Sequence, residues 1–164
     1  NYFATGLPPQ RDNGSDWPLL RPVLQNAAIK PQPADIAWMR DAFRDLLRIR
    51  AGTTLLRLRT AADINARLVF HNTGSAQVPT VVAASIDGTG YAGAGFQRLA
   101  YFINVGTTAQ TLTVPALAGQ AFRLHPVQAA ATAADRRVAT GASVNTSTGA
   151  FTVPARSAAV FVVP

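Results

Sequence analysis

Apolar residues recur every three or four positions between residues 33 and 52, in the stretch PADIAWMRDAFRDLLRIRAG. This spacing predicts an amphipathic helix over 33–51, because it places the apolar side chains on one side of the helix. Pro33 suits the first helical position, and Gly52 suits the position just after the last turn. The predicted apolar face consists of Ile36, Met39, Phe43, Leu46 and Leu47. Arginines and aspartates at ion-pair spacing indicate that the opposite side is solvated rather than an anion site.

From about residue 65 the apolar period changes from that of a helix to that of a strand. Strands are predicted near 66–71, 79–86, 98–105, 109–114, 121–127, 150–153 and 157–163, with a further one near 137–144. Turn sequences such as HNTGSAQ, DGTGYAGAG and STGA separate these runs. Short strands without intervening helices are typical of an antiparallel sandwich or barrel. We therefore predict a mainly β fold with a C-terminal antiparallel β-sandwich over residues 65–164.

The first 32 residues show neither the helical nor the strand period of apolar residues. Residues 1–33 hold six of the eleven prolines, and proline fixes φ and lacks an amide hydrogen. We therefore expect an irregular arm over 1–32, followed by the helix and a short linker over 33–64. The arm is nonetheless apolar, and such a segment should pack against another part of a protein. Together with the turn-rich opening NYFATGLPPQRDN, this predicts that the chain is the tail of a larger protein.

The net charge of +7 changes this picture little. The positive charge is almost all arginine, with Lys30 as the only lysine, and the acidic residues are all aspartates. The arginines are spread along the chain without an aromatic stripe beside them, so we expect no nucleic-acid binding. No apolar run approaches the roughly 18 residues of a membrane span, so we expect no membrane partner. The absence of cysteine leaves the compartment undecided, and a secreted or bacterial cell-envelope location is slightly favoured.

Candidate catalytic residues are few. The two histidines, His71 and His125, lack the spacing of metal ligands, and no GxSxG nucleophile motif accompanies them. The eight acidic residues are scattered along the chain, so no glycosidase-type carboxylate pair can be assigned. The glycine-rich DGTGYAGAG lacks the GxGxxG pattern of a phosphate-binding loop and is interpreted as a flexible crossover. We therefore predict structural histidines, no metal, no cofactor and no catalytic residue in this chain.

Several stretches together resemble one known family. GLPPQRDNGSDWPLLRPVLQNAAIKP resembles the segment that closes the catalytic barrel of pullulanase-type starch-debranching enzymes, which are α-1,6-glucan hydrolases of the α-amylase superfamily related to limit dextrinase. The resemblance continues through LLRIRAGTTLLRLRTAADINARLVFHNTGSAQVPTVVAASIDG and RLAYFINVGTTAQTLTVPALAGQAFRLHPVQ, and it ends with TGAFTVPARSAAVFVVP. It covers nearly the whole chain in order and spacing. Tyr2 and Ala4 depart from the family's usual Asn-Asn-aromatic-Gly-x-Gly-Leu-Pro-Pro opening, and the loop after Ile86 is shortened.

The resemblance implies a place in a longer glycoside hydrolase. Residues 1–32 would follow the last strand of a truncated TIM barrel, 33–64 would be its last helix and a linker, and 65–164 the sandwich. The catalytic carboxylates of such enzymes lie upstream, so this chain alone should be inactive and should meet α-glucan only through that barrel. The upstream catalytic barrel of the same polypeptide is the implied partner, and a weak homodimer of the fragment is also expected. Residues expected to pack against the barrel are Trp17, Leu20, Met39, Phe43, Leu46 and Leu47.

Two other functions remain open at this point. A stand-alone carbohydrate-binding module would use Trp17, Trp38, Tyr91 or Tyr101 to stack on sugar rings, although aromatic residues make up only 8% of the chain. An assembly sandwich without a carbohydrate role would need no such aromatic platform. Binding of maltooligosaccharide over exposed aromatics would separate the first from the second.

Overall fold

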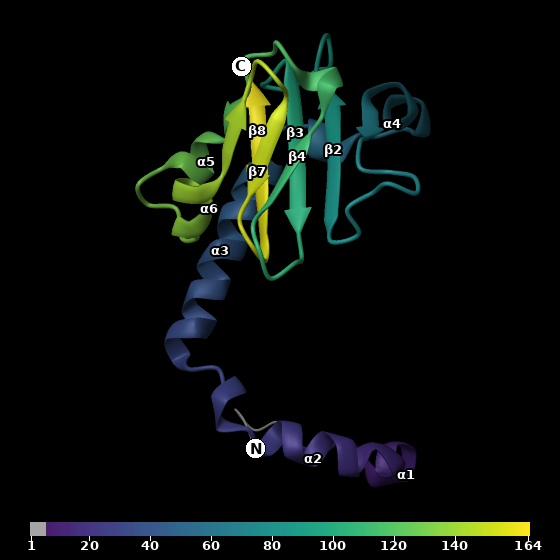
Figure 1. Cartoon of the computed structure of the whole chain (residues 1–164), viewed down its shortest axis with the longest axis vertical. Helices are drawn as coiled ribbons and strands as arrows, with labels where there is room; N and C mark the ends of the chain where they lie inside the picture. The colour runs from purple at the N-terminus through teal and green to yellow at the C-terminus, as the bar shows by residue number, and fades with distance from the viewer. Residues whose placement is uncertain (1–5) are drawn as a thin grey trace. The chain divides into compact units, whose positions relative to one another are not determined.

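The computed structural model describes residues 6–164 and divides the chain into two compact units, Asn1–Arg40 and Asp41–Pro164 (Figure 1). Tyr2 and Ala4, the two departures from the family's opening, lie outside the described residues. Within 6–164, no helix combines the length and the apolar composition that crossing a membrane requires.

The first unit is helical where an irregular arm was expected. Its elements are α1 (Gln10–Asn13), the 3-10 turn η1 (Gly14–Asp16), α2 (Trp17–Gln25) and the 3-10 turn η2 (Ala27–Ile29). The expectation of an irregular arm over residues 1–32 is therefore wrong for residues 10–29, most of which are helical. Helical residues already have the φ of about −65° that a proline ring imposes. Pro18 stands in the first turn of α2, where its missing amide hydrogen costs nothing, and Pro22 lies inside the helix at the cost of a backbone hydrogen bond. The Asn26 side chain accepts a hydrogen bond from the Ala28 amide at 3.0 Å and so begins η2.

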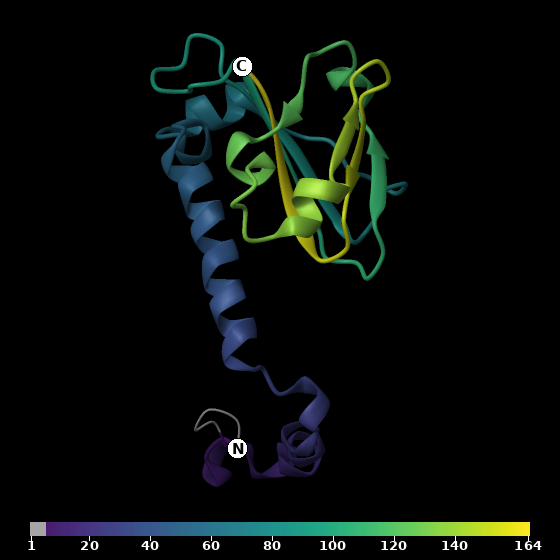
Figure 2. The ribbon, with the colours of Figure 1, turned by 90° about the vertical axis from the view of Figure 1, so that its left-hand side faces the viewer.

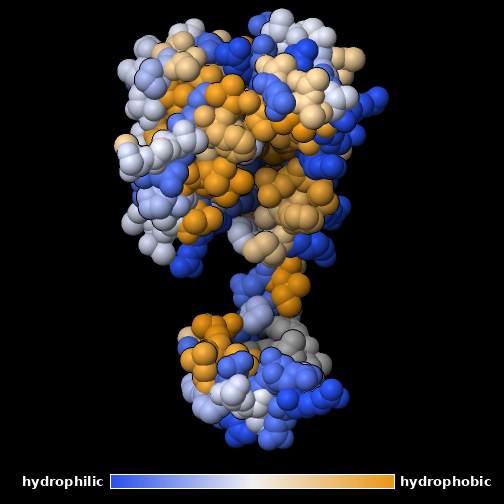
Figure 3. Space-filling model, turned by 90° about the vertical axis from the view of Figure 1, so that its right-hand side faces the viewer, coloured by the Kyte–Doolittle hydropathy of each residue, from blue (hydrophilic) through white to orange (hydrophobic). Residues whose placement is uncertain are grey.

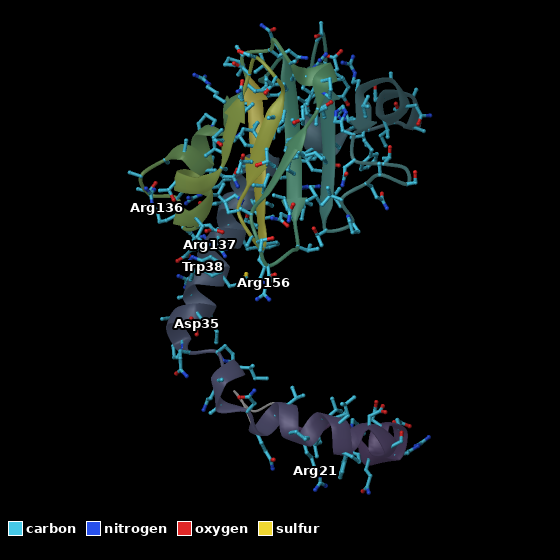
Figure 4. The ribbon with its side chains drawn as sticks, in the orientation of Figure 1. Arg21, Asp35, Trp38, Arg136, Arg137 and Arg156 are labelled. Carbon is cyan, nitrogen blue, oxygen red and sulfur yellow. The ribbon has the colours of Figure 1, made fainter. Side chains whose placement is uncertain are left out.

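Helix α3 spans Pro33–Ala51, the range that the apolar period predicts, and it runs from the first unit into the second. Pro33 occupies its first position, where a missing amide hydrogen costs nothing. The Asp35 carboxylate, labelled in Figure 4, accepts a hydrogen bond from the Gln32 amide at 2.8 Å and fixes the start of the helix. The Gly52 amide donates to the Arg48 carbonyl at 2.9 Å and closes the last turn.

The second unit is an antiparallel β-sandwich, as predicted. One sheet has five strands in the order β1-β2-β3-β8-β5, and the other has three in the order β4-β7-β6. The strands are β1 (Leu68–Phe70), β2 (Val81–Asp87), β3 (Arg98–Asn104), β4 (Gln110–Thr113), β5 (Arg123–Leu124), β6 (Ser143–Asn145), β7 (Ala150–Val153) and β8 (Ser157–Val163). Figure 2 shows the two sheets as facing layers, with the end of α3 against the outer side of the five-stranded sheet.

Phenyl rings fill the space between the two sheets. Phe151 of β7 stacks on Phe102 of β3 with ring centroids 4.6 Å apart, and it meets Phe122 and Phe161 edge to face at 5.4 and 5.1 Å. All four rings are buried. Alternate residues of a strand point to opposite sides of its sheet, so the other face of β2, β3 and β8 points away from this core.

A second, smaller core lies on that outer face. Ile49, near the end of α3, is 1% exposed and packs with Leu99 of β3 and Val162 of β8. Leu55, in the 3-10 turn η3 (Leu55–Arg57), is equally buried in the same cluster. Helix α4 (Ala61–Arg67) follows and leads into β1. The stretch predicted to be a linker therefore consists largely of η3 and α4, which cover part of the sheet.

Two predicted strands differ in the structure, and a proline and helix-capping side chains explain the differences. The strand expected over 121–127 shrinks to β5, because Pro126 begins the short helix α5 (Pro126–Ala129), which the His125 side chain caps. The strand expected near 137–144 is instead helix α6 (Arg136–Gly141) followed by β6. The Asp135 carboxylate accepts a hydrogen bond from the Arg137 amide at 3.1 Å, which favours a helix start at this point.

Candidate functional site

The residues predicted to pack on a barrel lie on two helices. Trp17 and Leu20, on α2 in the first unit, are half-buried. On α3, Met39 is 59% exposed and Phe43 is 58% exposed, while Leu46 and Leu47 are 37% and 46% exposed. Large apolar side chains on a helix are ordinarily covered, and burying one stabilises a protein by about 1.5–3 kcal/mol. The exposed apolar side chains of α3 are therefore a candidate docking surface.

A different side of α3 attaches the helix to the sandwich. The Asp45 carboxylate accepts hydrogen bonds from the Ala134 amide at 2.9 Å and from the Arg48 guanidinium at 3.1 Å, and Ile49 enters the outer-face core. At about 100° per residue, Phe43 and Leu47 lie roughly 160° around the helix from Asp45. Sequence reasoning missed Asp45 and Ile49 as docking residues, although their four-residue spacing places both on one side of the helix.

Two threonines directly after α3 fix the glycine-rich loop between β2 and β3. The Thr53 hydroxyl donates to the Ala94 carbonyl and the Thr54 hydroxyl to the Ala92 carbonyl, both at 2.7 Å. The Thr54 amide also donates to the Gly93 carbonyl at 3.1 Å. Gly93 has φ +74°, and a Cβ there would lie 2.8 Å from the Thr54 side chain, so glycine is required on both counts. The loop interpreted as a flexible crossover is thus bonded to the end of α3.

Each histidine hydrogen-bonds another group of the sandwich. His71 Nε2 bonds the Ser85 hydroxyl at 2.8 Å, and His125 Nδ1 accepts from the Val127 amide at 3.2 Å. Burial lowers the pKa of both rings, and the Arg98 charge lowers the pKa of His71 further. Within residues 6–164, no group of three or more His, Cys, Asp or Glu side chains is arranged to hold a metal ion.

Arginine side chains at one end of the sandwich bind the chain's own backbone. Figure 4 shows Arg136, Arg137 and Arg156 together at this end. Arg136 donates to the Ala130 carbonyl at 3.0 Å, and Arg137 pairs with Asp135 at 2.7 Å and reaches the Arg156 carbonyl at 3.4 Å. The guanidinium groups of these arginines therefore stabilise turns of the chain itself.

Two of the four aromatic residues considered for sugar stacking have a guanidinium over the ring. The Arg67 guanidinium lies 4.8 Å from the centre of the Tyr91 ring, and that of Arg21 lies 5.2 Å from the Trp17 ring. Trp17 also donates its indole N–H to the Pro8 carbonyl at 3.0 Å. Tyr101 lies in the wall of an apolar hollow, where burial raises the pKa of its hydroxyl. Trp38 is 39% exposed on α3 in the first unit.

That hollow lies on the outer side of the five-stranded sheet and holds about 360 Å³. Its lining residues come from η3, α4 and the adjacent strands, and they are Leu55, Leu56, Arg57, Leu58, Ile64, Leu68, Ile86 and Tyr101. Figure 3 shows apolar side chains gathered around a hollow on the side of the sandwich that carries α4. The predicted docking residues did not include this surface, since η3 and α4 were interpreted as linker.

Comparison with known proteins gives a consistent answer over the whole chain. The model of the family described as "Alpha-1,6-glucosidases, pullulanase-type, C-terminal" matches residues 1–164. The chloroplastic pullulanase 1 of Arabidopsis thaliana is 36% identical over 99% of this chain, and the pullulanase of Klebsiella pneumoniae is 28% identical over 100% of this chain. These alignments cover only 17% and 15% of the two relatives, so this chain corresponds to a small part of each.

Solved structures agree in fold. The crystal structure of a maltotriose complex of the Klebsiella pneumoniae pullulanase superposes with a TM-score of 0.82 at 28% identity, over 97% of this chain and 17% of that one. The apo form of the enzyme from the same organism gives a TM-score of 0.80 at 29% identity, with the same coverage. The resemblance expected from the sequence is therefore confirmed, and the chain belongs to the family of C-terminal domains of pullulanase-type α-1,6-glucosidases.

Proposed function

We propose that this chain is the non-catalytic C-terminal part of a starch- or pullulan-debranching glycoside hydrolase and that it stabilises an upstream catalytic barrel of the same polypeptide. In this proposal residues 1–32 and helix α3 complete the barrel, and the sandwich docks beside it. Hydrolysis of α-1,6 linkages is carried out by carboxylates of the upstream barrel. The α-glucan meets this chain only through that barrel.

The observation that carries the proposal is the two-sided character of α3. One side is fixed to the sandwich through Asp45 and Ile49. The side about 160° away exposes Phe43 and Leu47. A helix that is anchored on one side and apolar on the other suits a connecting element between two folded bodies. The length of the relatives supports the presence of a second body, because this chain matches only 17% of the Arabidopsis thaliana pullulanase.

The test of docking uses the full-length parent enzyme. Phe43→Asp places a charge where we propose an apolar contact, so the enzyme should unfold at a lower temperature than the wild type. Phe43→Leu keeps an apolar side chain and is the matched control, with a melting temperature near that of the wild type. If both variants melt with the wild type, α3 does not dock through Phe43 and the proposal fails.

A further inference from the structure

We propose that the side chain of Gln128 takes the place of a missing strand beside β8, and that it thereby prevents β8 from pairing with the same strand of a second copy of the chain. The surface concerned is the hydrogen-bonding edge of β8 at residues 158–160. This inference goes beyond the proposed function, because it concerns self-association of the sandwich and not its contact with a barrel.

Strand β5 covers only one end of this edge. It pairs with β8 as far as Leu124, which lies opposite Phe161, and the His125 amide then donates to the Val160 carbonyl at 2.8 Å. Pro126 begins α5, and the His125 carbonyl accepts instead from two amides within that helix, at 2.9 and 3.0 Å. In the part of the chain that the structure describes, the backbone after His125 therefore leaves the next segment of β8 without a partner strand on this side.

The carboxamide of Gln128 fills this position. Its Oε1 accepts a hydrogen bond from the Val160 amide at 2.8 Å, and its Nε2 donates to the Ala158 carbonyl at 2.7 Å. A side-chain amide carries the same acceptor and donor as a peptide group, so these two bonds reproduce those of a neighbouring strand. Gln128 is 6% exposed, and α5 holds it beside β8 on the side opposite β3 (Figure 1).

The sequence of β8 favours pairing with a copy of itself. Residues 157–163 read SAAVFVV, with β-branched or aromatic side chains at the last four positions and with no charge, glycine or proline. Segments of six or seven residues with this composition form tightly packed sheets of identical strands. A row of unpaired amides and carbonyls at a sheet edge is the template for such pairing. The occupant that fits the opened edge is therefore β8 of a second copy.

The faces of β8 are covered, so another chain can reach this strand only along its edge. Ala159 lies in the core between the two sheets, and Val160 lies in the core on the outer face. Helix α5 has four residues, and a helix of one turn is not stable without contacts to the rest of the fold. The two bonds of Gln128 attach this turn to β8, and their loss opens the edge.

Gln128→Leu in the full-length enzyme tests the proposal, because leucine keeps much of the size of the side chain and removes both bonds. Val153→Ala is the matched control, since it removes buried apolar atoms from β7 and leaves the edge of β8 intact. Each protein is held at the same interval below its own melting temperature, and assembly is followed by thioflavin fluorescence and light scattering. Gln128→Leu should assemble at least about tenfold faster than Val153→Ala, because two lost hydrogen bonds raise the population of the open edge by that order.

A synthetic peptide identifies the occupant of the edge. The probe is a fluorescent peptide of residues 157–163, flanked by lysines that keep it in solution. In the control peptide Val160→Pro removes an amide hydrogen that strand pairing requires. Fluorescence anisotropy should show that Gln128→Leu captures the first peptide, that the wild type does not, and that neither protein captures the proline peptide.

Gln128→Glu provides a second, milder variant if Gln128→Leu does not fold. It keeps an acceptor for the Val160 amide and loses the donor to the Ala158 carbonyl, so its assembly rate should lie between those of the wild type and Gln128→Leu.

Two outcomes overturn the inference. If the Gln128 variants assemble at the rate of Val153→Ala, assembly follows the loss of stability alone and the carboxamide does not close the edge. If the proline peptide is captured as well as the first peptide, binding does not use strand pairing. Neither outcome depends on the melting temperature of Phe43→Asp, so this inference and the proposed function fail separately.

Discussion

The carboxylate of Asp45 on α3 accepts a hydrogen bond from the backbone amide of Ala134 at 2.9 Å, across 89 residues of sequence. This bond joins the helix to the loop before α6, beside the buried Ile49. It explains how a helix that the sequence places before the sandwich becomes fixed to it. It also leaves Phe43 and Leu47 exposed on a different side of the same helix.

Asp45→Ala should destabilise the chain by about 1–3 kcal/mol, because it removes the carboxylate that accepts the hydrogen bond from the Ala134 amide and so weakens the attachment of α3 to the sandwich. Asp45→Asn keeps an oxygen acceptor in nearly the same place and should lower the free energy of unfolding less than Asp45→Ala does. Urea unfolding of the two variants measures the difference. Equal stability of Asp45→Ala and the wild type would show that this bond does not hold the helix. Asp12→Ala, on an exposed carboxylate in the first unit, is the control and should change little.

Phe151→Ala should cost about 3–5 kcal/mol, because it removes the ring that contacts Phe102, Phe122 and Phe161 between the two sheets. Phe70→Ala removes a ring of the same size from the exposed outer face and is the natural comparison. In the isolated chain, Phe70→Ala should lower the free energy of unfolding much less than Phe151→Ala does. Similar losses for the two variants in chemical denaturation would mean that the phenyl cluster is not the main core.

Lowering the pH should destabilise the sandwich through its two histidines. Burial lowers the folded-state pKa of His71 and His125 below the ordinary value of 6.5, so the unfolded chain binds more protons as the pH falls. Their stabilising contribution is therefore complete above about pH 6.5 and is lost as the pH drops through the lowered pKa values. Urea unfolding at a series of pH values should show this fall. The His71→Gln, His125→Asn double variant should lose less free energy of unfolding over the same pH range. An equal loss in the variant and the wild type would contradict the assignment of this pH dependence to the two histidines.

Maltooligosaccharides should bind this chain no more tightly than the millimolar range, which corresponds to about −4 kcal/mol. The physical reason is that arginines lie over the rings of Tyr91 and Trp17 and that Tyr101 lines an apolar hollow. Titration calorimetry measures the affinity directly. Saturable binding in the micromolar range would favour a carbohydrate-binding module instead.

Period and turn chemistry predicted the elements whose stability is mainly local or strongly patterned. Helix α3 matches its predicted bounds, and β7 and β8 fall where the apolar runs place them. The two-sheet architecture was expected because short apolar runs separated by turn sequences follow one another from residue 65 onward. The sequence therefore predicted the sandwich and the helix that precedes it.

The remaining elements depended on contacts that a pattern does not contain. Proline-rich α2 is helical because proline's φ is compatible with a helix, even though proline lowers helix propensity. Helix α6 forms at Asp135, where a side-chain cap outweighs a strand-like run. The roles of Asp45 and Thr53 depend on partners 89 and 41 residues away, so neither could be inferred from neighbouring residues.

The central claim is that this chain contributes stability to a debranching enzyme and none of its chemistry. The most direct measurement is the activity of full-length Phe43→Asp on pullulan and on linear α-1,4-glucan, taken per folded molecule well below its melting temperature. We predict that the ratio of the two activities equals that of the wild type, while the variant is inactivated faster on warming. A variant that keeps wild-type thermal stability but cleaves the two glucans in a different ratio would contradict the claim.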